Sequence, residues 1–158
     1  MKRLAIIIMF LAAAAMSAAA QDGKEIYNRY SGKKGVSSVY ISPTMFKMMK
    51  SLPEVSMESG EVDFSSIIKT FNGMYIIDIE EPELAKSLSE EVTAMAESGR
   101  YELMMEAAEE SEKVRIYIVS KGDIVTDFLM LAQEKDSSSV ISISAEMPFS
   151  ELQKLIAQ

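Results

Sequence analysis

Residues 101–146 read YELMMEAAEE SEKVRIYIVS KGDIVTDFLM LAQEKDSSSV ISISAE, and this stretch gives the clearest indication of the fold. Its apolar side chains alternate with polar ones, which is the period of a β-strand with one face toward a core. The alternation predicts strands over residues 101–108, 114–119, 125–133 and 140–146. Because the connections between them are short and polar, we expect an antiparallel meander of four strands.

The turn at Lys121, Gly122 and Asp123 leaves two registers open for the second and third strands. A two-residue turn would place Asp127 opposite Ile116. A three-residue loop with Gly122 in the left-handed conformation would pair Ile116 with Phe128 and Tyr117 with Asp127. We favour the second register, because it keeps the charge of Asp127 away from the core.

The two faces of this meander differ in composition, and we expect one of them to receive the helices. The face expected to pack against helices carries Leu103, Met105, Ile116, Ile118, Phe128, Met130, Ile141 and Ile143. The other face is expected to be amphipathic and to lie away from the main core. It carries Glu102, Met104, Glu106, Arg115, Tyr117, Asp127, Leu129, Ser142 and Ser144.

The remaining residues of the chain predict further helices and two more strands. We expect strands over residues 36–42 and 74–79, an exposed loop over 54–61, and helices over 22–30, 43–52, 64–71, 82–98 and 148–157. The fold class is therefore α+β. We expect a single domain over residues 21–158, with one sheet of about six strands and helices packed mainly on one face.

Residues 1–20 read MKRLAIIIMFLAAAAMSAAA, which is typical of a cleaved secretory signal peptide. Two basic residues precede an apolar run that is shorter than the roughly 20 residues needed to cross a membrane. Small residues at Ala18 and Ala20 predict cleavage after Ala20. We therefore expect a periplasmic or secreted protein with no transmembrane segment after signal removal, and no lipid anchor because no cysteine is present.

The composition excludes several function classes. The net charge of the whole chain is −8, and it becomes −10 when Lys2 and Arg3 leave with the signal peptide. This charge repels phosphate backbones, so we expect no nucleic-acid partner. Cysteine and histidine are both absent, which removes disulfides, the usual zinc sites and Ser-His-Asp catalysis. We expect no cofactor, no metal site and no catalytic residue.

Three stretches carry a resemblance to a known family. They are IYNRYSGKKGVSSVYISPTMFKMM at residues 26–49, YELMMEA at 101–107 and KVRIYIVSKGDIVTDFLML at 113–131. The chain resembles the small exported Bacteroidota proteins of domain of unknown function 4252 over nearly all of its expected mature length. The resemblance implies an α+β domain exported to the envelope, and it brings no established catalytic residues.

Two groups of side chains allow a more specific interpretation but favour a structural one. Met45, Met48 and Met49 have thioether groups that suit Cu(I), yet the same helical spacing is typical of core packing, which we favour. Acidic residues cluster at residues 78–83 and 106–112, where they could hold Ca²⁺ or act as a catalytic pair. We favour solvated surface and helix capping for these acids, because neither cluster has a calcium-loop pattern.

The candidate interaction surface comprises Glu106, Arg115, Tyr117, Asp127 and Leu129 on the amphipathic face of the meander. Arginine and aromatic side chains among apolar ones are typical of protein interfaces. We therefore expect a non-catalytic binding or interaction module whose partner is an envelope protein or a second copy of the chain. The alternative is a hydrolase-type enzyme that uses carboxylates without histidine or cysteine.

Overall fold

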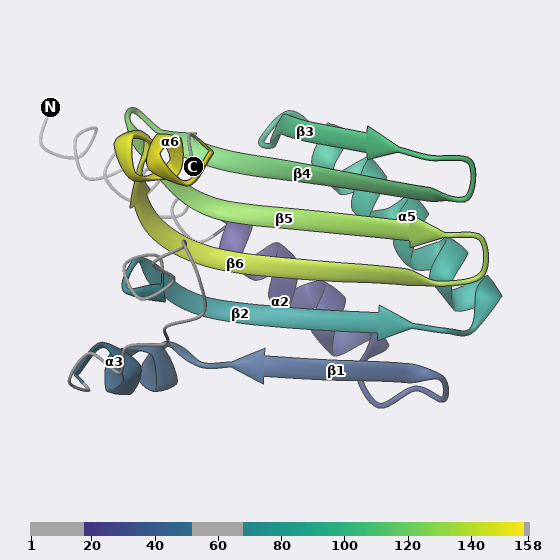
Figure 1. Ribbon diagram of the computed structural model, residues 1–158. Coiled ribbons are helices and arrows are strands. Elements are labelled where there is room, and N and C mark those ends of the chain that lie inside the picture. The colour runs from purple at the N-terminus through teal and green to yellow at the C-terminus, as the bar shows by residue number, and fades with distance from the viewer. Residues whose placement is uncertain (1–17, 52–67, 157–158) are drawn as a thin grey trace, which may run out of the picture.

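The computed structural model describes residues 18–51 and 68–156, which form one six-stranded antiparallel sheet with helices around it (Figure 1). The strands lie in the spatial order β1-β2-β6-β5-β4-β3, so the last four strands of the chain form the expected meander. The predicted α+β class and the single sheet are confirmed. The strands are β1 Val36–Ile41, β2 Phe71–Ile79, β3 Glu102–Ala108, β4 Glu112–Lys121, β5 Ile124–Glu134 and β6 Ser138–Pro148.

The described helices are α2 Ala18–Tyr30, α3 Pro43–Ser51, α5 Pro82–Glu97 and α6 Phe149–Ile156. Local sequence sets the limits of α5. The Glu81 carboxylate caps its start by accepting a hydrogen bond from the Leu84 N–H at 3.2 Å, and Gly99, at a φ of 101°, follows its end. The loop expected over residues 54–61 and the start of the helix expected over 64–71 lie outside the described residues. Phe71, expected in that helix, belongs to β2.

The pairing register of β4 with β5 differs from both registers predicted from the sequence. Gly122 and Asp123 form a two-residue turn, and a bulge then skips Thr126, so that Val119 pairs with Asp127. Consequently Ile116 lies opposite Met130 and Tyr117 opposite Leu129. The expected register is wrong by two residues: the turn has two residues instead of three, and the bulge adds one residue to β5. A shift of two residues leaves each of these side chains on its expected face.

The helices α2 and α5 lie on the face of the sheet opposite to the expected one. Figure 1 shows both helices behind the sheet, and the side chains they cover include Tyr117 and Leu129, which are 6% and 1% exposed. The expectation that the face with Ile116 and Phe128 receives these helices is therefore wrong. The main core consists of Ile26, Tyr30, Ile77, Ile79, Ala85, Leu88, Val92, Ala96, Tyr117, Leu129, Leu131 and Val140.

Helix α2 approaches the sheet closely at Gly23. A Cβ atom at this position would come within 2.3 Å of the Ser142 Oγ and 2.8 Å of the Ser142 Cβ. Such distances are far shorter than ordinary van der Waals contact, so the absence of a side chain at Gly23 allows α2 to rest directly on β6. This contact helps to fix which face of the sheet the helix covers.

Candidate interaction surface

A row of apolar side chains crosses all six strands on the face opposite to α2 and α5. The strand pairings align one residue from each strand in this row, which we call the central row. Its members, from β1 to β3, are Val39, Ile76, Ile141, Met130, Ile116 and Met105. Because directly paired residues point to the same side of a sheet, these six side chains form an unbroken apolar line from one edge to the other.

A second row lies beside the central row, toward α6. The same pairings align Ile41, Met74, Ile143, Phe128, Ile118 and Glu102, so five of its six members are apolar. On the other side of the central row five of the six side chains are small or polar, and the sixth is Val114. The row consists of Ser37, Asp78, Ser139, Ala132, Val114 and Ala107. The two apolar rows therefore have a defined border. Together they form what we call the open face.

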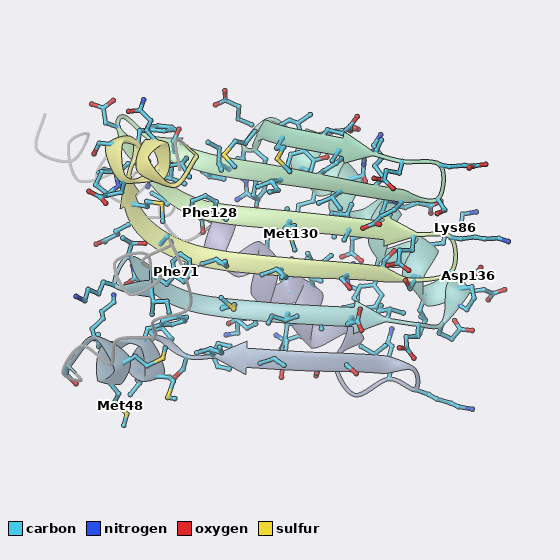
Figure 2. The ribbon with its side chains drawn as sticks, in the orientation of Figure 1. Met48, Phe71, Lys86, Phe128, Met130 and Asp136 are labelled. Carbon is cyan, nitrogen blue, oxygen red and sulfur yellow. The ribbon has the colours of Figure 1, made fainter. Side chains whose placement is uncertain are left out.

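The open face is not covered by α2 or α5. Figure 2 shows Phe128 and Met130 on the near side of the sheet, with these helices behind it. At the two ends of the central row, Val39 is 47% exposed and Met105 46% exposed. At about 4.8 Å per strand, the two rows span roughly 400 Å² of sheet. Helix α6 covers part of the second row, where Ile118 is 4% exposed.

A hollow of about 220 Å³ lies on the open face near α6. All the side chains that line it are apolar: Phe71, Ile116, Phe128, Met130, Ile141, Ile143, Met147 and Leu152. Leu152 comes from α6, which packs over this end of the sheet with Ile118, Val125 and Met147. Since no polar group lines the hollow, it suits an apolar side chain or ligand and offers no hydrogen bond to a polar one.

The residues predicted as an interaction surface lie on the helix-covered face. Glu106 and Arg115 are paired across β3 and β4, and the Arg115 Nε donates to Glu106 Oε2 at 2.9 Å. The Arg115 guanidinium also donates to Thr93 Oγ1 on α5 at 3.3 Å. Tyr117 and Leu129 pair with each other beneath the helices. These four side chains are neighbours, as expected, but they join the sheet to α5 rather than forming a surface open to a partner.

Asp127, the fifth predicted residue, is buried farther along β5. Its carboxylate accepts hydrogen bonds from Thr126 Oγ1 at 2.8 Å and from Ser144 Oγ at 3.4 Å. Burial raises the pKa of Asp127, and the two hydroxyl donors oppose this effect. The bulge therefore places a carboxylate inside the protein and supplies polar partners for it. The reasoning that the charge would avoid the core was incorrect.

A second carboxylate lies near Asp127 at the start of α2. Asp22 forms an ion pair with Arg100 and accepts a hydrogen bond from the Tyr101 hydroxyl at 3.1 Å. Burial and the charge of Asp22 both raise the pKa of Tyr101. These contacts join α2 to the segment between α5 and β3. They hold the helix on its face of the sheet, and the structure gives them no role beyond this.

The predicted acidic clusters lie at the end of the sheet opposite to α6. A polar hollow of about 480 Å³ is found there, lined by Glu80, Ser111, Glu112, Glu134, Lys135, Asp136 and Ser137. Within residues 18–51 and 68–156, no group of three or more acidic side chains is arranged to hold a metal ion. Figure 2 labels Asp136 at this end and Phe71 at the other, so the polar and apolar hollows lie at opposite ends of the sheet.

The methionines of α3 differ from the core stripe that their spacing predicts. Phe46 is the buried residue of this helix, whereas Met45 and Met48 are exposed. Figure 2 shows Met48 on the outer side of α3. The core interpretation of Met45 and Met48 is therefore wrong. A single short helix at the end of the sheet buries only one of its sides, and that side is centred on Phe46, which packs edge-on against Phe71.

The central row was missed by the sequence reasoning because its members come from strands that are far apart in the chain. Val39 and Ile76 lie in predicted strands, but nothing in the sequence places these strands next to β6. The β-branched and apolar residues of VSSVYI and MYIIDI were the available signal. None of the helices in the described part of the chain is long and apolar enough to span a membrane.

The comparisons with known proteins identify a family. The model of the family described as Domain of unknown function (DUF4252) matches residues 30–155, which include every strand of the sheet. No curated protein and no solved structure matches the chain. Since the match spans most of the sequence, the chain belongs to the DUF4252 family.

Proposed function

We propose that this protein is an exported envelope protein that acts as a non-catalytic binding module, and that the open face is its binding element. The proposed location is periplasmic or extracellular. It rests on the signal-peptide pattern of residues 1–20. The proposed partner is the apolar surface of another envelope protein.

The observation that carries the proposal is the central row, six apolar side chains aligned across every strand of the sheet. A soluble domain gains nothing from placing apolar side chains at the two exposed ends of such a row, since Val39 and Met105 remain in contact with water. A partner that covers the row would remove this surface from water. Burial of apolar surface is the dominant favourable contribution to most protein association.

The hollow beside α6 supports the same proposal. Its lining contains no polar group, so a partner side chain that enters it meets only apolar atoms. A pocket of this kind can receive an aromatic or aliphatic anchor residue, and such anchors account for much of the binding energy at interfaces. The rows would provide the contact area, and the hollow would provide the anchor point.

Site-specific photo-crosslinking in cells that export the protein tests the proposal. A photoreactive amino acid at Met130, in the middle of the central row, should give a discrete adduct with another envelope protein. The same group at Leu103 serves as the matched control, because Leu103 is half exposed but pairs with Tyr117 on the helix-covered face. Adducts from neither position, or the same adducts from both, would exclude the open face as the binding element.

A further inference from the structure

The two terminal strands of the sheet carry opposite charge. Residues 31–51, which contain β1, hold the four lysines Lys33, Lys34, Lys47 and Lys50 and no acidic residue. Residues 97–112, which contain β3, hold six glutamates and one arginine. In a chain of net charge −8, one sheet edge is therefore basic and the opposite edge acidic. From this polarity and the strand geometry below, we propose that β1 of one copy pairs with β3 of a second copy, antiparallel and head to tail.

The backbone of β1 is suited to accept another strand. Its pairing with β2 is regular over six residues, and it contains no charged residue, glycine or proline. The Glu80 N–H donates to the Gly35 carbonyl at 3.1 Å, which makes Gly35 and Glu80 a hydrogen-bonded pair. Because such pairs alternate along an antiparallel ladder, Ser38 and Tyr40 direct their N–H and C=O groups away from the sheet. Edge strands with these properties readily pair with other chains.

The outer edge of β3 is regular over the residues that would pair with β1 of a second copy. The bulge in this strand lies between Leu103 and Met105, and the pairing with β4 is continuous from Met105 to Ala108. The Glu109 N–H donates to the Glu112 carbonyl at 2.8 Å, so Glu106 and Ala108 direct their backbone groups outward by the same alternation. Both edges therefore offer outward-pointing groups on residues of the helix-covered face. This match allows the faces of two joined sheets to continue into each other.

Continuation of the central row selects a register. If Val39 lies opposite Met105 of the second copy, Ser38 lies opposite Glu106 and Val36 opposite Ala108. Ser38, Glu106 and Ala108 direct both backbone groups outward. Val36 offers only its C=O to the second copy, because its N–H donates to the Lys33 carbonyl at 3.3 Å. The same register places Lys34 opposite Glu110 of the second copy. Lys34 and Glu110 are exposed and form no ion pair with any described residue, so both are available for this contact.

Symmetric pairings are less favourable on the same evidence. A two-fold pairing of β1 with β1 would bring the lysine-rich flanks of two copies together, and a pairing of β3 with β3 would do the same for the glutamates. Head-to-tail pairing leaves one β1 edge and one β3 edge free in every assembly, so further copies can add. We therefore expect assembly beyond dimers. This proposal concerns the sheet edges, and it stands whether or not the open face binds a partner.

Charge exchange and sedimentation velocity of the purified exported chain test the proposal. The wild-type mass should increase with concentration past that of a dimer, and Lys34→Glu or Glu110→Lys alone should weaken association by about two- to fivefold, the range expected for an exposed ion pair. The double exchange should restore it. Monomers at every concentration, association that stops at dimers, or failure of the double exchange to restore association would overturn the proposal.

Two edge-blocked variants provide an independent test. Proline removes an outward N–H in Ser38→Pro and in Ala108→Pro, whereas Ser38→Ala and Ala108→Ser keep it. Each proline variant alone should form at most weak dimers. A 1:1 mixture of the two proline variants should form dimers through the two intact edges and no larger assemblies. Both control variants should assemble like wild type. Circular dichroism identifies any proline variant that does not fold. In that case the charge-exchange variants of Lys34 and Glu110 test the proposal without it. Unrestricted assembly of a folded proline variant would refute the model.

Discussion

Leu103 and Met105 lie two residues apart on β3 and are almost equally exposed, at 50% and 46%, yet they belong to opposite faces of the sheet. Leu103 pairs with Tyr117 on the face under α5, and Met105 pairs with Ile116 on the open face. The bulge between them produces this arrangement, because it places Met104 and Met105 together opposite one residue of β4. The two residues therefore provide a comparison in which strand and exposure are matched and only the face differs.

Lysine at either position should have little effect on folding. We expect Leu103→Lys and Met105→Lys each to change the free energy of unfolding by less than about 1 kcal/mol, because both side chains already contact water. Urea denaturation of the two variants and the wild type measures this. A loss of stability much larger for Met105→Lys than for Leu103→Lys would mean that the open face is part of the folded core, contrary to the structure.

Leu129 and Met130 should differ strongly in their contribution to stability. Leu129 lies within the core under α2 and α5, whereas its neighbour Met130 is only partly buried on the open face. Leu129→Ala should cost about 2–5 kcal/mol, the usual range for a large core residue, and Met130→Ala less than half of that. Chemical denaturation of both variants and the wild type measures these losses in the free energy of unfolding. If Met130→Ala were the more destabilising substitution, the helices would cover the other face.

These two neighbours also show what could be predicted from the sequence. The alternation in β5 identified the strand and placed Leu129 and Met130 on opposite faces, because a side-chain period of two is a property of any strand. Which face receives the helices is a different question, since both faces are apolar in the middle of the sheet. It depends on contacts such as that of Gly23 with Ser142, which join segments far apart in the chain.

The candidate site was predicted less well for the same reason. Glu106, Arg115, Tyr117 and Leu129 were correctly expected to be neighbours, because all four lie in the meander, where pairing is local. The central row includes Val39 and Ile76, and their place in it depends on the pairing of β2 with β6 across more than sixty residues of sequence. The bulge at Thr126 was also unpredicted, because no residue type in this turn requires it.

Gly23→Ala should destabilise the protein, although alanine is the better helix former. In an isolated helix this substitution would stabilise by about 1 kcal/mol. Here the new Cβ would overlap Ser142, so α2 must shift away from β6, at a cost of about 1–3 kcal/mol. Thermal denaturation measures the sign, and a double-mutant cycle with Ser142→Gly tests the cause. An increase in stability for Gly23→Ala would show that α2 does not rest on Ser142.

Asp127 and Glu106 should affect the pH dependence of folding in opposite directions. Burial raises the pKa of Asp127, so the folded state binds this proton more tightly than the unfolded state, and stability from this group is gained as pH falls. Hydrogen bonds from Arg115 and Lys113 lower the pKa of Glu106, so its contribution is present at neutral pH and is lost as pH falls through the folded pKa. The physical causes differ: one carboxylate is buried, and the other is exposed beside two cations.

Two amide substitutions separate these contributions. At neutral pH, Asp127→Asn should be at least as stable as wild type, since asparagine keeps an oxygen that accepts from Thr126 and removes the buried charge. Glu106→Gln should be slightly less stable than wild type. Both differences should shrink as the pH falls from 7 to below about 4. The difference for Asp127→Asn shrinks through the raised pKa of Asp127, and that for Glu106→Gln shrinks through the lowered pKa of Glu106, because each wild-type side chain then becomes neutral. Urea denaturation across this range measures both variants. If Asp127→Asn were less stable than wild type by an amount that decreased in acid, the carboxylate of Asp127 would be stabilised in the folded state, and the bulge would be a site that favours its charge.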